Sequence, residues 1–119
     1  MNIKQGDIWM INFNPSIGSE IQKERPAVVI NSDSIGRFGL SIVVPITEWK
    51  DFFEDFPWII KIQNSPQNGL SKLSAIECFQ IKNFSQKRFV KKIGSIDNEM
   101  LENIHTKVLK TLNPTYKIA

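Results

Sequence analysis

The chain has 119 residues, of which 41% are hydrophobic and 23% are charged. This composition predicts a single globular domain over residues 1–119 and excludes a disordered chain. No apolar stretch approaches the roughly 20 residues of a membrane-spanning helix, and the N-terminus lacks the apolar region of a signal peptide. The one cysteine, Cys78, has no partner for an internal disulfide. Together these features predict a cytoplasmic protein that does not enter a membrane.

The net charge of +3 is unevenly distributed along the chain. Residues 1–60 carry five basic and eight acidic side chains, whereas residues 61–119 carry ten basic and four acidic ones. A basic surplus of this kind is compatible with a polyanionic partner such as nucleic acid, and equally with a solvated surface that has no partner.

Three segments in the first half of the chain have the composition of β-strands. Residues 7–13 are rich in β-branched and aromatic side chains and end at Asn14-Pro15, which disfavours continued regular structure. Residues 25–31 are predicted to form a buried strand. Residues 40–47 are predicted to form a third strand, in which Pro45 indicates a bulge or a sheet edge.

The second half begins with a segment that has no clear period. Residues 48–57 mix four carboxylates with four aromatic side chains and are predicted to be a loop that packs partly on the domain. A fourth strand is expected over residues 58–62, two short extended pieces over 70–74 and 75–82, and a last strand over 89–94.

Only the C-terminal segment has the period of a helix. Asp97 is a suitable N-cap, and Asn113-Pro114 ends the pattern. Apolar residues in between recur at steps of three and four and form one stripe: Leu101, Ile104, Val108 and Leu112. The predicted fold is therefore mainly β with a C-terminal helix, as a small, twisted antiparallel barrel or sandwich whose opening the helix covers.

Several kinds of chemistry are unsupported by the sequence. With one histidine and one cysteine, and no ligand spacing among the carboxylates, no metal or other cofactor is expected. His105 is interpreted as a partly buried residue of the helix, and Cys78 as a small core residue. What remains is a polar loop before the second strand, containing Ser19, Glu20 and Arg25. Such a loop is either a functional site or a solvated surface.

A set of motifs distributed in order over nearly the whole chain resembles the MazF/PemK-like toxins of type II toxin–antitoxin systems. The motifs are Gly6-Asp7-Ile8-Trp9, Asn14-Pro15, Gly18-Ser19-Glu20, Arg25-Pro26-Ala27-Val28-Val29-Ile30, Val43-Val44-Pro45-Ile46-Thr47, Gly69-Leu70, Ser74, Gln80-Ile81, Arg88 and Ile93-Gly94. The resemblance implies an SH3-like barrel of the CcdB/PemK type, a homodimer, and metal-independent cleavage of single-stranded RNA. It also implies a cognate MazE-like antitoxin that blocks the RNA groove.

The resemblance implies a catalytic role for three residues. Arg25 would stabilise charge on the phosphate, since a planar guanidinium can hold two oxygens, and would also protonate the leaving 5′-oxygen. Thr47 would donate its hydroxyl to a phosphate oxygen. Glu20 is the candidate general base for the 2′-hydroxyl, or alternatively a residue that reads a base edge.

RNA contacts are expected on the same basis at Ser19, Ser74 and Gln80. Lys87 and Arg88 lie in a segment with five basic residues and no acidic one, which is either a phosphate-binding surface or a solvated hairpin. Two rival functions on the same fold are a CcdB-like inhibitor of DNA gyrase and a barrel that binds RNA without cutting it.

Overall fold

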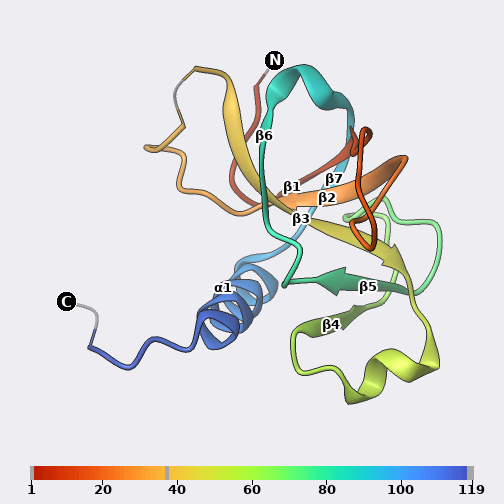
Figure 1. The fold of residues 1–119 in the computed structure, drawn as a ribbon. Coiled ribbons are helices and arrows are strands. Elements are labelled where there is room, and N and C mark those ends of the chain that lie inside the picture. Colours follow the sequence, from red (N-terminus) through yellow and green to blue (C-terminus); the bar gives the residue numbers. More distant parts are fainter. Residues whose placement is uncertain (1, 37, 118–119) are drawn as a thin grey trace.

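The predicted strands assemble into one strongly curved antiparallel sheet in the computed structural model, which describes residues 2–36 and 38–117 (Figure 1). The strands are β1 (Asp7–Asn12), β2 (Glu24–Val29), β3 (Leu40–Glu48), β4 (Ile59–Ile62), β5 (Ser74–Glu77), β6 (Lys82–Ser85) and β7 (Phe89–Ser95). Their order is β4-β5-β3-β2-β1-β7, and β6 pairs with β3. The helices are the 3₁₀ turns η1 (Asp51–Asp55) and η2 (Gln86–Arg88) and the α-helix α1 (Asn98–Leu112).

Strands β1 and β2 contribute side chains to two separate cores because successive residues of a strand point to opposite faces. Ile8 lies opposite Val28 in the ladder, and both belong to the larger core. Trp9 lies opposite Ala27, and both belong to the second core. Both faces of these two strands are therefore apolar, and each face packs into its own core.

Strand β3 changes partner along its length. Its first half pairs with β2 and β6, and from Ile46 onward it pairs with β5. The change follows Pro45, which has no N–H to donate to a ladder. The sequence-based expectation at this proline was a bulge or a sheet edge. The structure shows a change of partner strand there, after which β2 and β3 diverge.

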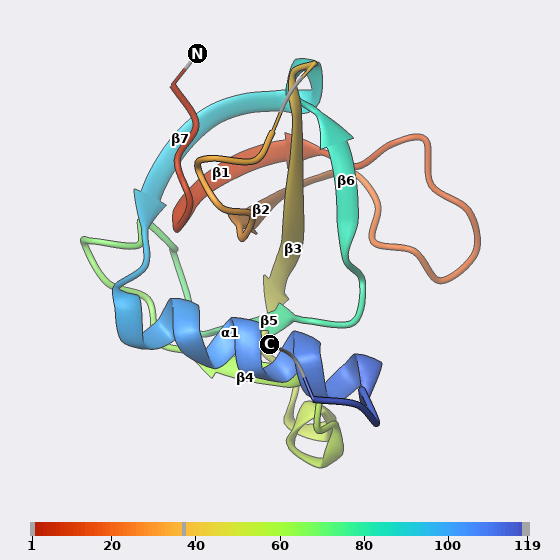
Figure 2. The ribbon, with the colours of Figure 1, turned by 90° about the vertical axis from the view of Figure 1, so that its left-hand side faces the viewer.

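Helix α1 covers one opening of the curved sheet, as expected (Figure 2). The Asp97 carboxylate accepts a hydrogen bond from the Met100 N–H at 2.8 Å and forms the predicted N-cap. Ile104 is fully buried in the larger core, with Met100 and Val108 packed against it. The predicted stripe was wrong at its end, because Leu112 is 67% exposed where the helix extends beyond the sheet.

Two other segments differ from the sequence-based prediction. Residues 48–57 contain η1 instead of forming an irregular loop, and the rings of Phe52, Phe53 and Phe56 pack there in T-shaped and tilted pairs. The extended piece predicted over 70–74 is not a strand before Ser74, and residues 75–82 divide into the end of β5, a turn and the start of β6.

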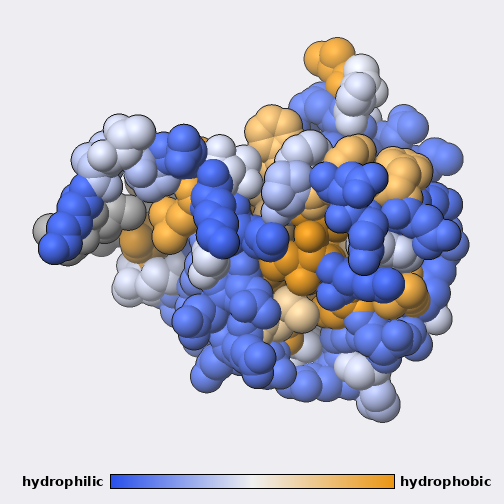
Figure 3. Space-filling model, turned by 90° about the horizontal axis from the view of Figure 1, so that it is seen from below, coloured by the Kyte–Doolittle hydropathy of each residue, from blue (hydrophilic) through white to orange (hydrophobic). Residues whose placement is uncertain are grey.

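Seen from below, hydrophobic patches interrupt a mainly hydrophilic surface (Figure 3).

The described helices include none with the length and apolarity needed to cross a membrane.

Candidate active site

A groove opens where β2 and β3 diverge. It has a volume of about 390 Å³. Its walls come from the ends of these two strands, from β1 and β7, and from residues 69–74 before and at the start of β5. The last paired residues of the β2–β3 ladder are Ala27 and Pro45. Continued by two residues, this register places Arg25 opposite Thr47 across the opening, and both residues line the groove.

The polar side chains of the groove are oriented by nearby main-chain carbonyls. Arg25 Nε donates to the Gln22 carbonyl at 3.3 Å, and Thr47 Oγ1 donates to the Glu48 carbonyl at 3.2 Å. Ser74 is buried at the groove wall and donates from its hydroxyl to the Lys72 carbonyl at 2.8 Å. Because Arg25 is held through Nε, the two terminal nitrogens of its guanidinium have the geometry to bind two oxygens of a phosphate.

Five charged residues line the groove: Glu24, Arg25, Glu48, Lys72 and Lys91. Glu48 forms ion pairs with Lys72 at 3.3 Å and with Lys50 at 3.6 Å. The hydrogen bond from Lys72, together with the positive charges of both lysines, lowers the pKa of the Glu48 carboxyl from its usual value. The groove thus carries three cations against two carboxylates, one of which is already paired.

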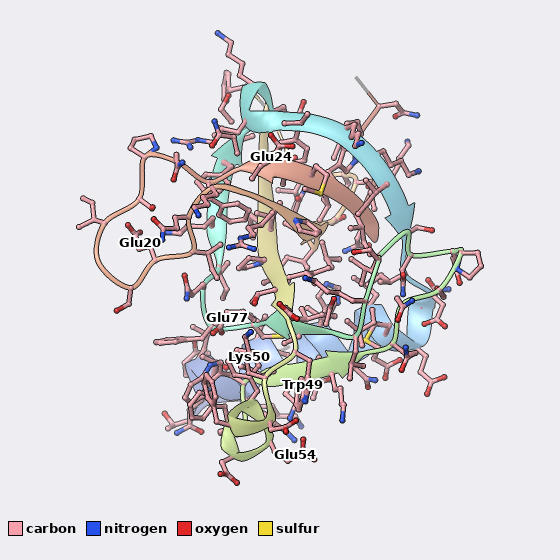
Figure 4. All side chains as sticks on the ribbon, turned by 90° about the vertical axis from the view of Figure 1, so that its right-hand side faces the viewer. Glu20, Glu24, Trp49, Lys50, Glu54 and Glu77 are labelled. Carbon is pink, nitrogen blue, oxygen red and sulfur yellow. The ribbon has the colours of Figure 1, made fainter. Side chains whose placement is uncertain are left out.

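Glu20 lies outside this groove, on the loop of residues 13–23 that connects β1 to β2 (Figure 4). Its carboxylate accepts a hydrogen bond from the Ile17 N–H at 2.7 Å and forms an ion pair with Lys82. The hydrogen bond from Lys82, and then that from Ile17, lower the pKa of the Glu20 carboxyl from its usual value.

Gln80 and Arg88 hold the same loop in place. Gln80 accepts a hydrogen bond from the Ile21 N–H at 2.7 Å and donates to the Ser19 carbonyl at 3.5 Å. Arg88 donates to the Asn12 and Asn14 carbonyls at 3.2 and 2.6 Å. These contacts join segments about 60 to 75 residues apart in the sequence, so residues from distant strands help to hold the loop in addition to its own hydrogen bonds.

Three further residues considered in the sequence analysis lie outside the groove. Lys87 is exposed at η2, where its N–H donates to Ser85 Oγ at 3.2 Å. Cys78 is buried, and burial raises the pKa of its thiol to about 12, as expected of an inert core cysteine. His105 is partly buried on α1, as predicted, with its Nε2 2.9 Å from the Ile30 carbonyl oxygen. The described residues contain no group of three or more His, Cys, Asp or Glu side chains placed to hold a metal ion.

One wall of the groove depends on a close approach between two backbones. Gly69 has a φ of +68°, in the left-handed region, and a Cβ built on it would lie 1.9 Å from the Ile93 carbonyl oxygen. A Cβ on Gly94 would lie 2.4 Å from the Asn68 carbonyl. Only glycine fits at either position, and the fit brings residues 69–74 against β7.

The structure divides the predicted site residues into two groups. Arg25, Thr47 and Ser74 meet in the groove. Ser19 and Glu20 lie in the loop of residues 13–23, Gln80 and Arg88 contact that loop, and Lys87 lies at η2. Sequence reasoning missed Lys72. It gave no individual role to Glu48 or Lys91, although Glu48 begins the acidic and aromatic segment of residues 48–57 and Lys91 lies in the basic segment considered for phosphate binding.

Comparison with known proteins identifies relatives over nearly the whole chain. Residues 4–112 match the family described as PemK-like, MazF-like toxin of type II toxin-antitoxin system. Endoribonuclease EndoA of Bacillus subtilis is 28% identical over 104 residues, covering 87% of this chain and 89% of that protein. The endoribonuclease toxin ChpB of Escherichia coli is 26% identical over 102 residues, covering 83% of this chain and 84% of that protein.

Solved structures share the fold at low sequence identity. MazF from Deinococcus radiodurans superimposes with a TM-score of 0.78 at 19% identity, over 94% of this chain and 97% of that one. An endoribonuclease from a mycobacterial species, solved with its cognate antitoxin, has a TM-score of 0.73 at 10% identity, over 98% of this chain and 100% of that one. The predicted mainly β fold of the MazF type is confirmed. The chain belongs to the PemK-like, MazF-like toxins of type II toxin–antitoxin systems.

Proposed function

We propose that this protein is an endoribonuclease toxin that cleaves single-stranded RNA at a short sequence without a metal ion. The observation that carries the proposal is the placement of Arg25 and Thr47 on opposite sides of one groove with a surplus of cations. Family membership and the endoribonuclease names of the relatives support the same reaction.

The reaction requires no nucleophile from the protein. The 2′-hydroxyl of the RNA attacks the adjacent phosphorus, so that an O2′–P bond forms and the P–O5′ bond breaks. The 2′-hydroxyl proton passes to a general base, and the leaving 5′-oxygen takes a proton from a general acid. The products are a 2′,3′-cyclic phosphate and a 5′-hydroxyl end.

Arg25 and Thr47 hold the phosphate in this proposal. The two terminal nitrogens of Arg25 contact the non-bridging oxygens, where negative charge grows in the transition state. Arg25 also supplies the proton for the leaving oxygen. Thr47 turns its hydroxyl from the Glu48 carbonyl to the phosphate.

The general base has two candidates. The sequence favours Glu20, but its ion pair with Lys82 and its place outside the groove mean that the loop of residues 13–23 must move before it reaches the RNA. Glu24 lines the groove beside Arg25. A pH–rate profile separates the two: the residue whose change to glutamine removes the acidic limb is the base.

The remaining predicted contacts concern RNA binding. Ser74 lies in the groove and offers a hydroxyl to a base or a sugar. Lys87 is solvent-exposed and suits a phosphate contact, whereas Ser19, Gln80 and Arg88 contribute by shaping the loop that borders the RNA path. Neutralising a residue that contacts phosphate lowers the slope of log affinity against log salt, which is the test of Lys87.

We further propose a homodimer in the cytoplasm, inhibited by a cognate MazE-like antitoxin that occupies the groove. Structures of MazE–MazF from Deinococcus radiodurans and of the mycobacterial endoribonuclease with its antitoxin support the partner class. Sedimentation of the purified protein measures the dimer, and a mass near 13.7 kDa at micromolar concentration would contradict it.

The function is tested with a long single-stranded RNA in excess EDTA. The wild-type protein is expected to cut at one short motif and leave cyclic phosphate ends, whereas Arg25→Ala removes cutting. Arg25→Lys is the matched control, since it keeps the charge but loses the planar fork, and it is expected to restore little. Folded protein that does not cut would refute the proposal and favour a CcdB-like gyrase inhibitor or an RNA-binding barrel.

A further inference from the structure

Glu48 occupies a position in the groove that the proposed reaction leaves without a role. It is the last residue of β3, follows Thr47 directly and lies opposite Ser74 in the β3–β5 ladder. Like both of these residues, it lines the groove. A carboxylate this close to the phosphate-binding threonine would repel RNA if its charge were uncompensated.

The charge of Glu48 is compensated in a specific way. Its Oε2 lies 3.3 Å from Lys72 Nζ and 3.6 Å from Lys50 Nζ, so one oxygen holds both lysines. Lys72 comes from the segment after Gly69, and Glu48 from β3, so the ion pair joins two walls of the groove. The carboxylate is thereby fixed in direction without adding net negative charge to the RNA path.

The second oxygen of Glu48 remains available. Within the described parts of the chain, Oε1 makes no hydrogen bond or ion pair, and the side chain is 49% exposed. An ionised carboxylate accepts hydrogen bonds and donates none. A fixed acceptor beside the phosphate site therefore discriminates among ligand groups by whether they carry an N–H or O–H donor.

Nucleobases differ in this property. Cytosine, adenine and guanine each carry an exocyclic amino group, whereas uracil carries carbonyl oxygens and has its one ring donor, N3–H, between them. A carboxylate placed to accept a hydrogen bond from an exocyclic amino group would face a carbonyl oxygen if uracil took the same position, and it would repel that oxygen. In single-stranded RNA these edges are free of base pairing and open to protein side chains.

We propose that Glu48 is a specificity-determining residue, which accepts a hydrogen bond from the exocyclic amino group of a base next to the cut phosphate. The inference rests on the proposed ribonuclease function. Glu48 and Thr47 both line the groove, so a phosphate held by Thr47 places an adjacent base within reach of Glu48. The Lys72 and Lys50 ammonium groups act as positioning groups for the carboxylate.

The test compares cut sites in a pool of randomised single-stranded RNA, sequenced after digestion by wild-type protein and variants. Wild-type protein is expected to disfavour uridine at one position beside the cut. Glu48→Leu cannot accept a hydrogen bond and should reduce this discrimination about tenfold, the value of one good base contact. Glu48→Gln offers an acceptor and a donor, so it should admit uridine at that position. Glu54→Gln is the matched control: Glu54 lies on η1, away from the groove-lining residues, and should keep the wild-type profile.

The outcomes separate this inference from the function on which it rests. If wild-type protein cuts and Arg25→Ala does not, but Glu48→Leu keeps the wild-type base preference at every position, the inference is overturned alone. Equal acceleration at all sites by both Glu48 variants also overturns it, since that result assigns Glu48 an electrostatic effect only. If wild-type protein cuts no RNA, the function and the inference fall together. Urea unfolding checks that each variant is folded. Both Glu48 variants should unfold close to wild type, because exposed ion pairs contribute little stability.

Discussion

Replacing Gly69 by alanine is expected to destabilise the protein more than its backbone angle alone explains. Two costs are present at this position. The left-handed backbone, with φ +68°, costs an alanine about 1–2 kcal/mol. In addition, the new Cβ would lie 1.9 Å from the Ile93 carbonyl oxygen, against an ordinary contact of at least 3.4 Å. Residues 69–74 or β7 must therefore shift by about 1.5 Å.

A matched variant at Gly39 separates the cost of that shift from the cost of the backbone angle. Gly39 has nearly the same φ, +67°, but a Cβ on it meets no atom within 4 Å. Gly39→Ala thus carries only the backbone cost. Overpacking typically adds about 1–3 kcal/mol, so Gly69→Ala is expected to lose that much more in the free energy of unfolding.

Urea unfolding measures the difference. With a slope of about 1–3 kcal/mol per molar urea, the midpoint for Gly69→Ala should lie roughly 1 M below that for Gly39→Ala. Equal midpoints for the two variants would show that the contact between Gly69 and β7 does not constrain this wall of the groove, and the reasoning would be wrong.

Three other predictions follow from the described contacts. Ile104→Ala, which leaves a cavity at the fully buried position on α1, should cost about 2–5 kcal/mol of unfolding free energy in the same assay, whereas Leu112→Ala at the exposed helix end should cost well under 1 kcal/mol. The pKa of the Glu20 carboxyl, measured by NMR, should lie below its usual value and return toward it in Lys82→Met. Because the folded pKa is lowered, the ion pair stabilises the fold at neutral pH, and this contribution is lost as the pH falls through the folded pKa. Cys78, with a pKa raised to about 12, should not react with a thiol reagent at pH 8 until the protein unfolds; rapid labelling of folded protein would contradict its burial.

The parts of the fold that the sequence predicts are those set by local periodicity. The alternation in β1 and β2 and the three- and four-residue steps around Ile104 each follow from the geometry of one element. The end of α1 was not predictable in this way, because Leu112 continues the apolar period past the edge of the sheet it would pack on. Exposure there depends on where the core beneath the helix ends, which no local pattern records.

The partner change of β3 shows a second limit. Pro45 signals an irregularity, but the sequence around it does not say which strand takes over the pairing. That choice is made by β5, almost 30 residues later. The loop of residues 13–23 is similar, because Gln80 and Lys82 hold it from about 60 residues away. The sequence therefore indicated a functional loop at Glu20 without revealing that this carboxylate is engaged by another strand.

The groove depends on both local and non-local features of the sequence. Its donors are oriented locally: Arg25, Thr47 and Ser74 bond to carbonyls one to three residues away in the chain. Short sequence motifs can therefore determine how these three side chains are oriented, which explains why the motifs pointed to them. The space between the donors is non-local, since it exists only where β2 and β3 diverge and residues 69–74 approach β7. Lys72 enters the site through that space and belongs to no motif.

Variants of Thr47 test whether its locally oriented hydroxyl takes part in RNA cleavage. Its hydroxyl donates to the Glu48 carbonyl in the free protein, so exchanging that bond for one to a phosphate oxygen leaves no additional donor unpaired. A hydrogen bond to a charged group contributes about 1.5–3 kcal/mol, so Thr47→Val should slow RNA cleavage roughly 10- to 150-fold while keeping the shape of the side chain. Thr47→Ser keeps the hydroxyl and should stay within about threefold of wild type. Equal cleavage by the valine and serine variants would exclude the hydroxyl from the reaction and leave Arg25 as the only phosphate-binding group proposed for the groove.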